Sequence, residues 1–306
     1  MKRAPHALLA AAFVWGLSVP LATAVLHHLT AADLVLVENV SGTLIVGGAA
    51  LVTRRSLAGP WRPAIVLGSL EPGLAYVLVN LGLMRTTAAA GAMLLALESV
   101  FIAGLGWLFL RERVRTREAY ALSLGLFGAL LVALAETGGS GSMSGNILVV
   151  LGSLAAAAYA VAARRLAVGV DPLGLVFRQG VAAIALTLPY VVWSWSTEGS
   201  RIPSASGTTL GLAALEGLVG FAIPFVLWAY AAPHVRANVA GVAINVVPVV
   251  GVLTAAVVGL GAPTLGQLAG GALILSGVLL LSLRRTPESV DVSNGVTPDR
   301  ELISLP

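Results

Sequence analysis

Residues 87–109, TAAAGAMLLALESVFIAGLGWLF, form a continuous apolar run in which Glu98 is the one charged residue. The hydrocarbon core of a bilayer is about 30 Å thick, and a helix needs roughly 20 residues to cross it. Charged residues flank the run, with Arg85 before it and Arg111-Glu112-Arg113 after it. We therefore interpret this run as a transmembrane helix.

The same pattern recurs along the chain. Of the 306 residues, 58% are hydrophobic and 10% are charged, whereas soluble domains carry roughly a quarter charged residues. The runs lack the alternation of membrane barrel strands, which favours helices. The sequence predicts an all-α integral membrane protein with ten transmembrane helices, at about 7–27, 33–53, 63–84, 87–109, 118–136, 146–164, 173–195, 208–231, 238–260 and 264–284.

The N-terminal segment has two interpretations. Met1-Lys2-Arg3, an apolar stretch and the small residues Ala22-Thr23-Ala24 fit a cleaved signal peptide. However, the apolar run continues to Leu26. For that reason we interpret it as the first transmembrane helix.

The basic residues predict an orientation. If the N-terminus is cytoplasmic, the external loops hold Arg85 and Arg201 alone. The cytoplasmic segments then hold Lys2, Arg3, Arg54, Arg55, Arg62, Arg111, Arg113, Arg115, Arg117, Arg164, Arg165, Arg236, Arg284 and Arg285. Because basic loops resist translocation, both termini are expected in the cytoplasm, and residues 286–306 are expected to form a disordered cytoplasmic tail. The same flanking residues explain the high pI of about 10.0 without a nucleic-acid partner.

Two halves of the chain share a plan. Ser99 to Glu112 and Pro248 to Gly261 each span the end of an apolar run and a short turn, and Leu70-Glu71 finds a counterpart in Leu215-Glu216. Five helices per unit is an odd number, so the second unit enters the membrane from the opposite side. We expect two inverted five-helix repeats, at 1–137 and 146–285. The alternative is that apolar helices resemble one another by composition alone.

Five short segments stand out along the chain, namely Trp15-Gly16-Leu17-Ser18-Val19-Pro20, Ala96-Leu97-Glu98-Ser99-Val100-Phe101, Leu110-Arg111-Glu112-Arg113, Asn245-Val246-Val247-Pro248-Val249 and the segment 270–277, GGALILSG. In their order and spacing they resemble the EamA branch of the drug/metabolite transporter superfamily, and the resemblance covers about residues 7–284. The resemblance implies ten helices in two inverted halves. It also implies transport of metabolites such as amino acids, often outward, or of drugs and nucleotide sugars in related branches.

The chain departs from the family pattern at three places. Ser99 replaces a common proline, Gly261 lacks the following acid, and Glu38-Asn39 stands where an arginine is frequent. These departures leave the substrate open.

Ionisable residues inside apolar runs are the sharpest functional signal, because a charge at the bilayer centre costs about 2.5–3.5 kcal/mol on insertion scales. Glu98 lies near the middle of its run, and Glu71 and Glu216 lie about eight residues into theirs. A buried carboxyl group that binds and releases a proton can couple transport to a proton gradient. We predict these three residues as coupling candidates; a structural hydrogen bond to a neighbouring helix is the alternative.

Seven further residues are candidates for substrate binding. Arg178 can hold a carboxylate or phosphate by bidentate bonding, or extend to the cytoplasmic interface. Amides deep in a run bind polar groups or link helices, and aromatic rings line a pathway or simply pack. The remaining candidates are Asn80, Asn245, Trp15, Tyr76, Tyr159 and Trp228.

Other kinds of site find no support in the sequence. The chain has no cysteine and lacks the zinc-protease HExxH pattern and the ATP-binding GxxxxGK[ST] loop. Adjacent His27 and His28 point to different helix faces and make a poor metal pair. We therefore expect no enzyme activity, metal or cofactor. Gly266 and Gly270 form a GxxxG pattern, which permits a close helix contact within the bundle or across a homodimer.

The expected protein is a secondary transporter in the cytoplasmic membrane of a bacterium. It exports small metabolites such as amino acids by alternating access, driven either by a proton gradient or by the gradient of the substrate itself. Multidrug or nucleotide-sugar transport and a membrane protein without transport activity are the alternatives.

Overall fold

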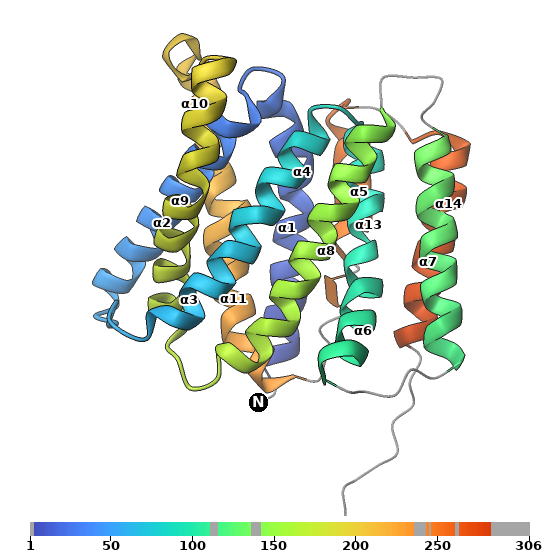
Figure 1. Cartoon of the computed structure of the whole chain (residues 1–306), viewed down its shortest axis with the longest axis horizontal. Helices are drawn as coiled ribbons and strands as arrows, with labels where there is room; N and C mark the ends of the chain where they lie inside the picture. The colour runs from blue at the N-terminus through green and yellow to red at the C-terminus, as the bar shows by residue number, and fades with distance from the viewer. Residues whose placement is uncertain are drawn as a thin grey trace, which may run out of the picture.

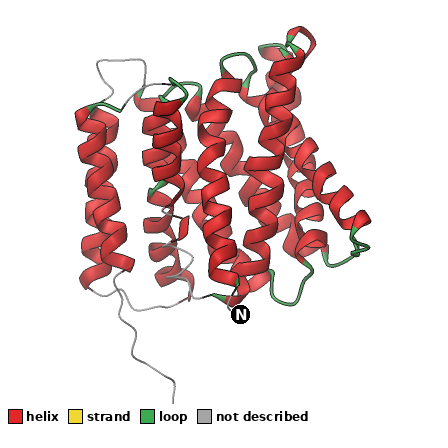
Figure 2. Ribbon diagram, turned by 180° about the vertical axis from the view of Figure 1, so that it is seen from behind, coloured by secondary structure: helices red, strands yellow, loops and turns green. Residues whose placement is uncertain are grey.

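A computed structural model describes residues 3–110, 116–135, 142–235, 243–244, 246–260 and 263–282. All regular secondary structure in these ranges is helical, as Figure 2 shows, which confirms the all-α class. Seven helices in the described ranges are long and apolar enough to cross a membrane, and two further apolar helices are shorter. The full count of ten transmembrane helices stays a prediction.

The elements follow the predicted apolar runs. In the first part of the chain they are α1 (Ala4–Leu26), α2 (Ala31–Val52), α3 (Trp61–Gly68), η1 (Ser69–Leu74), α4 (Ala75–Leu83), α5 (Ala88–Leu95), α6 (Leu97–Leu110) and α7 (Thr116–Leu134). In the second part they are α8 (Met143–Leu166), α9 (Pro172–Thr197), η2 (Ile202–Ser204), α10 (Gly207–Glu216), η3 (Gly217–Ala222), α11 (Ile223–Ala231), η4 (Ala232–His234), α13 (Val246–Val257) and α14 (Leu265–Ser282).

Side-chain caps fix where several helices begin. The hydroxyl of Thr30 accepts a hydrogen bond from the backbone N–H of Asp33, and the Asp33 carboxylate accepts one from the N–H of Thr30. This reciprocal capping box satisfies two backbone donors that a helix start leaves free. The hydroxyls of Thr87, Ser142 and Ser206 each accept one backbone hydrogen bond and so cap the starts of α5, α8 and α10.

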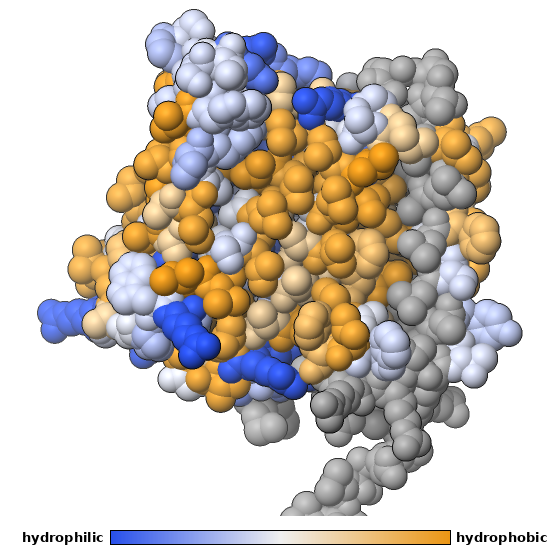
Figure 3. Space-filling view, in the orientation of Figure 1, coloured by the Kyte–Doolittle hydropathy of each residue, from blue (hydrophilic) through white to orange (hydrophobic). Residues whose placement is uncertain are grey.

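Consecutive helices run in opposite directions from α1 to α3 and from α8 to α10 (Figure 1). Figure 1 shows the α2–α3 and α8–α9 connections at the end where the N-terminus lies, and the α1–α2 and α9–α10 connections at the other end. The visible surface is apolar across the middle and hydrophilic toward the two ends (Figure 3). This distribution fits a molecule whose middle faces lipid.

Helices from the two parts of the chain pack against each other throughout. α2 lies along α9, α4 along α8, and α1 along α11 and α13. α7 and α14 form a further pair at one edge of the bundle, as Figures 1 and 2 both show. The core is therefore built between the parts rather than inside each of them.

The GxxxG pattern of α14 serves the contact with α7. A methyl group on Gly266 would lie 2.6 Å from Ala135 Cβ, and one on Gly128 would lie 2.5 Å from the carbonyl oxygen of Gly270. Small residues let two helix backbones approach this closely. The pattern is thus used within the chain.

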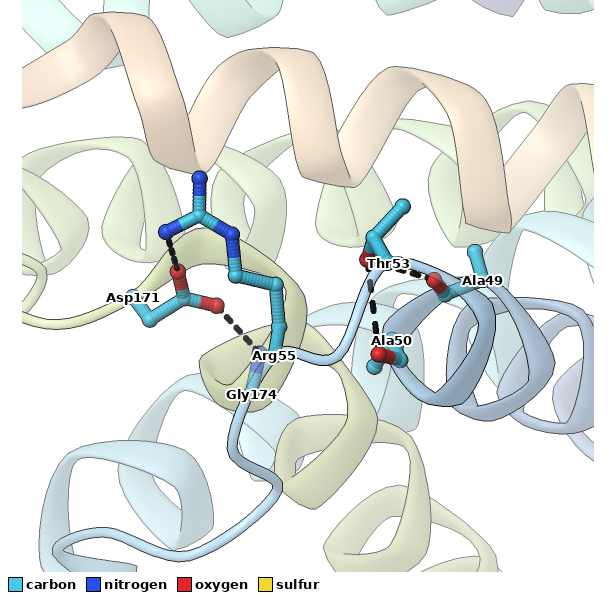
Figure 4. Close-up of polar contacts among 6 residues, drawn as sticks. All are labelled: Ala49, Ala50, Thr53, Arg55, Asp171 and Gly174. Carbon is cyan, nitrogen blue, oxygen red and sulfur yellow. Dashed lines mark hydrogen bonds and ion pairs between the residues drawn. The ribbon is translucent and has the colours of Figure 1, made fainter.

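A polar contact joins the end of α2 to the start of α9 (Figure 4). Arg55 Nη1 lies 3.6 Å from Asp171 Oδ2, while Asp171 Oδ1 accepts a hydrogen bond of 3.1 Å from the N–H of Gly174 and caps α9. Both charged side chains are solvent-accessible, so the ion pair contributes little to stability.

Two of the spans are interrupted near their centres. In the third span the backbone at Glu71 is extended, with φ −150° and ψ 128°, so α3 and α4 are separated by η1. In the span Gly207–His234, η3 is a π-helical segment between α10 and α11. Both interruptions contain or precede a proline, Pro72 and Pro224 respectively, and proline cannot donate a helical hydrogen bond.

Candidate functional site

The two interruptions free backbone carbonyl groups, and side chains from the other part of the chain satisfy them. Gln179 Nε2 donates a hydrogen bond of 2.8 Å to the carbonyl oxygen of Glu71. The carbonyl oxygen of Gly220 accepts one of 2.8 Å from Trp15 Nε1 and another from the Tyr76 hydroxyl. Irregular backbone at membrane depth is tolerated where such partners exist.

A cavity of about 80 Å³ lies beside these two interruptions. Its lining comes from both parts of the chain and comprises Trp15, Ser18, Val19, Ala22, Glu38, Glu71, Ala75, Tyr76, Val79, Asn80, Leu83, Leu95, Ala156, Glu216, Ile244 and Val247. The lining is mostly apolar, with three carboxyl groups, one amide and one phenol among its polar members. None of these described lining residues is basic.

Glu38 is a member of the site that the sequence analysis did not select. Its side chain is 2% exposed, and its Oε1 accepts a hydrogen bond of 2.9 Å from Asn80 Nδ2. Asn80 therefore lines the cavity and also orients this carboxyl group. The signal was available, because Glu38 lies inside the apolar run 33–53 just as Glu71 lies inside 63–84.

Glu216 enters the cavity from the end of α10, next to η3. Its side chain is 3% exposed, it interacts with Ser18, and its Oε2 has no hydrogen-bond partner. Glu38 lies within electrostatic range of Glu216. The backbones meet here as well, since a methyl group on Gly217 would lie 2.7 Å from the carbonyl oxygen of Glu38. The two carboxyl groups thus face one cavity from the two parts of the chain.

Glu71 and Glu98 form a second pair. Glu71 is 9% exposed, lines the cavity and lies within electrostatic range of Glu98. Glu98 is half-buried in the first turn of α6 and is not among the residues that line the cavity. The three predicted coupling candidates are therefore divided between two neighbouring pairs, with Glu216 beside Glu38 and Glu71 beside Glu98.

The four predicted aromatic residues lie together. Trp15 and Tyr76 line the cavity, whereas Tyr159 and Trp228 are fully buried behind it. Phe225 joins them, with its ring centroid 5.2 Å from that of Trp15 and 5.3 Å from that of Tyr159. Trp228 packs on Trp15 at 5.6 Å. This arrangement makes a rigid aromatic wall on one side of the cavity.

Arg178 lies apart from this group. Arg178 is 1% exposed and its Nη1 donates a hydrogen bond of 2.6 Å to the carbonyl oxygen of Leu57, in the α2–α3 connection. It is not among the residues that line the cavity. Asn245 lies outside the described residues. No group of three or more His, Cys, Asp or Glu residues in the described ranges could hold a metal ion.

Comparison with protein families decides what this architecture is. The sequence model of the EamA-like transporter family matches residues 4–134 and again residues 143–283. The chain belongs to the EamA-like transporter family. This confirms the resemblance found in the sequence, and with it an integral membrane protein.

Relatives of this EamA-family protein carry transporter names. It is 28% identical over 249 residues, 80% of each chain, to a probable terminal-alkyne amino-acid exporter of Streptantibioticus cattleyicolor. It is 26% identical over 223 residues, 72% of each chain, to the uncharacterized transporter YdfC of Bacillus subtilis. One crystal structure matches with a TM-score of 0.68 at 21% identity, covering 92% of this chain and 97% of the other, which supports the fold.

Proposed function

We propose that this EamA-family transporter exports small metabolites such as amino acids by alternating access through the cavity described above. The observation that carries the proposal is the position of that cavity. It lies where two spans are interrupted, and helices from both parts of the chain line it. Discontinuous helices at the junction of repeats form the substrate sites of many secondary transporters.

The lining supports a small substrate with a polar group. A buried water needs roughly 10–15 Å³ of such space, so about 80 Å³ accommodates a molecule the size of five to eight waters. Carboxyl groups and the absence of basic side chains among the described lining residues disfavour anionic nucleotide sugars. The name of the Streptantibioticus relative, a probable amino-acid exporter, points to the same size class.

The transport cycle that we propose uses two units, 1–137 and 146–285, as inverted repeats that exchange conformations. The family model matches one segment in each unit, which supports this division. Both termini lie in the cytoplasm in this scheme, with the protein in the cytoplasmic membrane of a bacterium. The tail 286–306 takes no part in transport.

Glu98 and Glu71 are the proposed coupling residues. The two carboxyl groups lie within electrostatic range of each other, and in the proposed cycle the pair binds one proton and releases it again. A gradient of protons then drives export. Glu98→Gln removes the exchangeable proton but keeps the shape of the side chain.

The experiment begins with cells that express the wild type, Glu98→Gln, or no transporter, and measures metabolites in the medium. A metabolite that accumulates outside with the wild type alone is then used in proteoliposomes. We expect Glu98→Gln to lose flux driven by a pH gradient and to keep exchange of substrate against substrate. The exposed Glu198→Gln is the matched control and should behave like the wild type.

Two results would contradict the proposal. If correctly inserted wild type changes no metabolite in the medium and catalyses no exchange, export is wrong. If Glu98→Gln retains the full response to a pH gradient, the transporter is not coupled through this residue.

A further inference from the structure

We infer that Glu38 and Glu216 jointly bind the protonated amino group of the substrate, so that amines lacking a carboxylate are recognised as well as amino acids. The inference rests on the proposed transport function and adds the chemical group that is recognised. It assigns a substrate-binding role to Glu38, which the sequence analysis did not select, and it assigns Glu216 to the substrate instead of the coupling proton.

The first argument is the unpaired oxygen of Glu216. The side chain is 3% exposed and lines the cavity, yet Oε2 has no hydrogen-bond partner. Leaving a buried polar atom unpaired is unfavourable, and more so for a carboxylate. Because Glu216 lines the cavity, a donor group of a bound substrate can supply the missing partner.

The second argument is the arrangement of Glu38. Asn80 occupies Oε1 of Glu38 at 2.9 Å, which fixes the direction of the carboxyl group inside the cavity. Glu216 lies within electrostatic range of Glu38, and no described lining residue supplies a positive charge between them. A cation that binds between the two relieves the repulsion of both. An alkylammonium group has three N–H donors, enough to reach both carboxylates at once.

The third argument is the aromatic wall. Trp15 and Tyr76 both line the cavity, and their hydrogen-bonding groups are directed to the carbonyl oxygen of Gly220. Their positions are fixed, and aromatic faces attract cations. By contrast, the described lining offers no arginine, lysine or histidine to a substrate carboxylate. The ammonium group is the one part of an amino acid for which the described cavity has charged partners.

Direct binding tests the inference without requiring transport. Purified transporter in detergent is titrated with four compounds that share an isobutyl unit, namely L-valine, isobutylamine, N-acetyl-L-valine and isovalerate, and the melting temperature is followed. We expect valine and isobutylamine to raise the melting temperature, because each has a free ammonium group. The acetylated and deaminated compounds should not raise it.

Variants locate the site. Glu38→Gln and Glu216→Gln should each weaken isobutylamine binding by about ten- to a hundredfold, the effect of losing one charge-assisted hydrogen bond. Glu198→Gln should leave it unchanged. If Glu38→Gln does not fold, Glu38→Asp replaces it, because the aspartate retains the charge at a shorter reach and should weaken binding while leaving the preference for amines.

Three results would overturn the inference. The first is equal binding of valine and isovalerate. The second is a melting temperature that rises with sodium chloride but with neither valine nor isobutylamine. The third is an unchanged affinity for isobutylamine in both Glu38→Gln and Glu216→Gln. The outcomes separate this inference from the proposed function. Amine binding without any flux contradicts transport alone, and flux of compounds that lack an amino group contradicts the ammonium site alone.

Discussion

The carbonyl oxygen of Gly220 illustrates how a single proline creates a demand that distant residues meet. Pro224 lies four residues after Gly220 and has no N–H to donate, so the helical partner of this carbonyl is missing. Trp15 and Tyr76 donate to it instead. Either donor alone satisfies the oxygen, whereas loss of both leaves a buried acceptor unpaired.

This redundancy predicts a non-additive effect on stability. Trp15→Phe and Tyr76→Phe each leave one donor on the oxygen, so the double variant should cost about 1–3 kcal/mol more than the sum of the two single losses. Denaturant titration in detergent gives the free energy of unfolding of each variant, and from these values the interaction energy between the two substitutions is calculated. Trp193→Phe with Tyr230→Phe, at two exposed positions, is the control and should be additive. Additive losses at Trp15 and Tyr76 would mean that the two side chains do not share this acceptor.

At the scale of elements, the contact between α2 and η3 depends on the absence of side chains. A methyl group on Gly217, the first residue of η3, would lie 1.9 Å from Ser41 Oγ of α2 and close to Glu38. A methyl group on Gly48, which is also in α2, would have no neighbouring atom within 4 Å. The close approach is what brings Glu38 and Glu216 to one cavity.

Gly217→Ala should therefore destabilise the protein by about 1–3 kcal/mol, as overpacking does, and lower transport by separating the two carboxyl groups. Gly48→Ala should be neutral or stabilise it by about 0.5–1 kcal/mol, because alanine is the better helix former. Melting temperature and substrate exchange are measured for both variants. A Gly217→Ala protein as stable and active as Gly48→Ala would show that the contact is not close in the membrane.

The sequence predicts the position of a helix well where that position depends on the residues of the helix itself. The apolar run 7–27 predicts α1 (Ala4–Leu26) well, since length and hydropathy are local properties. The start of α2 lies earlier than the predicted residue 33, because hydropathy does not register the cap at Thr30.

The site was less predictable than the helices. Sequence reasoning selected Trp15, Tyr76, Asn80, Glu71 and Glu216, all of which line the cavity. It placed Arg178 among them, although a connection distant in sequence holds that side chain. It missed Glu38, whose relation to Glu216 arises from packing between helices far apart in the chain.

For the molecule as a whole, orientation is the prediction to test. The chain contains no cysteine, so a single introduced thiol reports its own side of the membrane. Ser204 in the α9–α10 connection and Ser56 in the α2–α3 connection are both exposed and belong to opposite ends of the bundle. In intact cells a membrane-impermeant maleimide should label Ser204→Cys and spare Ser56→Cys.

Permeabilised cells supply the control, since both variants should then react. The reverse labelling pattern in intact cells would place the termini outside and overturn the positive-inside argument. Labelling of both positions in intact cells would contradict a bundle that crosses the membrane between them.

The hydrogen bonds between the two parts of the chain affect how the protein can evolve as well as how it folds. The carbonyl of Glu71 relies on Gln179, and that of Gly220 relies on Trp15 and Tyr76. Neither part is a self-sufficient module that recombination could trade for a foreign counterpart. Each part supplies hydrogen-bond donors to a backbone carbonyl group of the other, so these residues should change together, and a gene split between α7 and α8 would encode two polypeptides that need each other to fold.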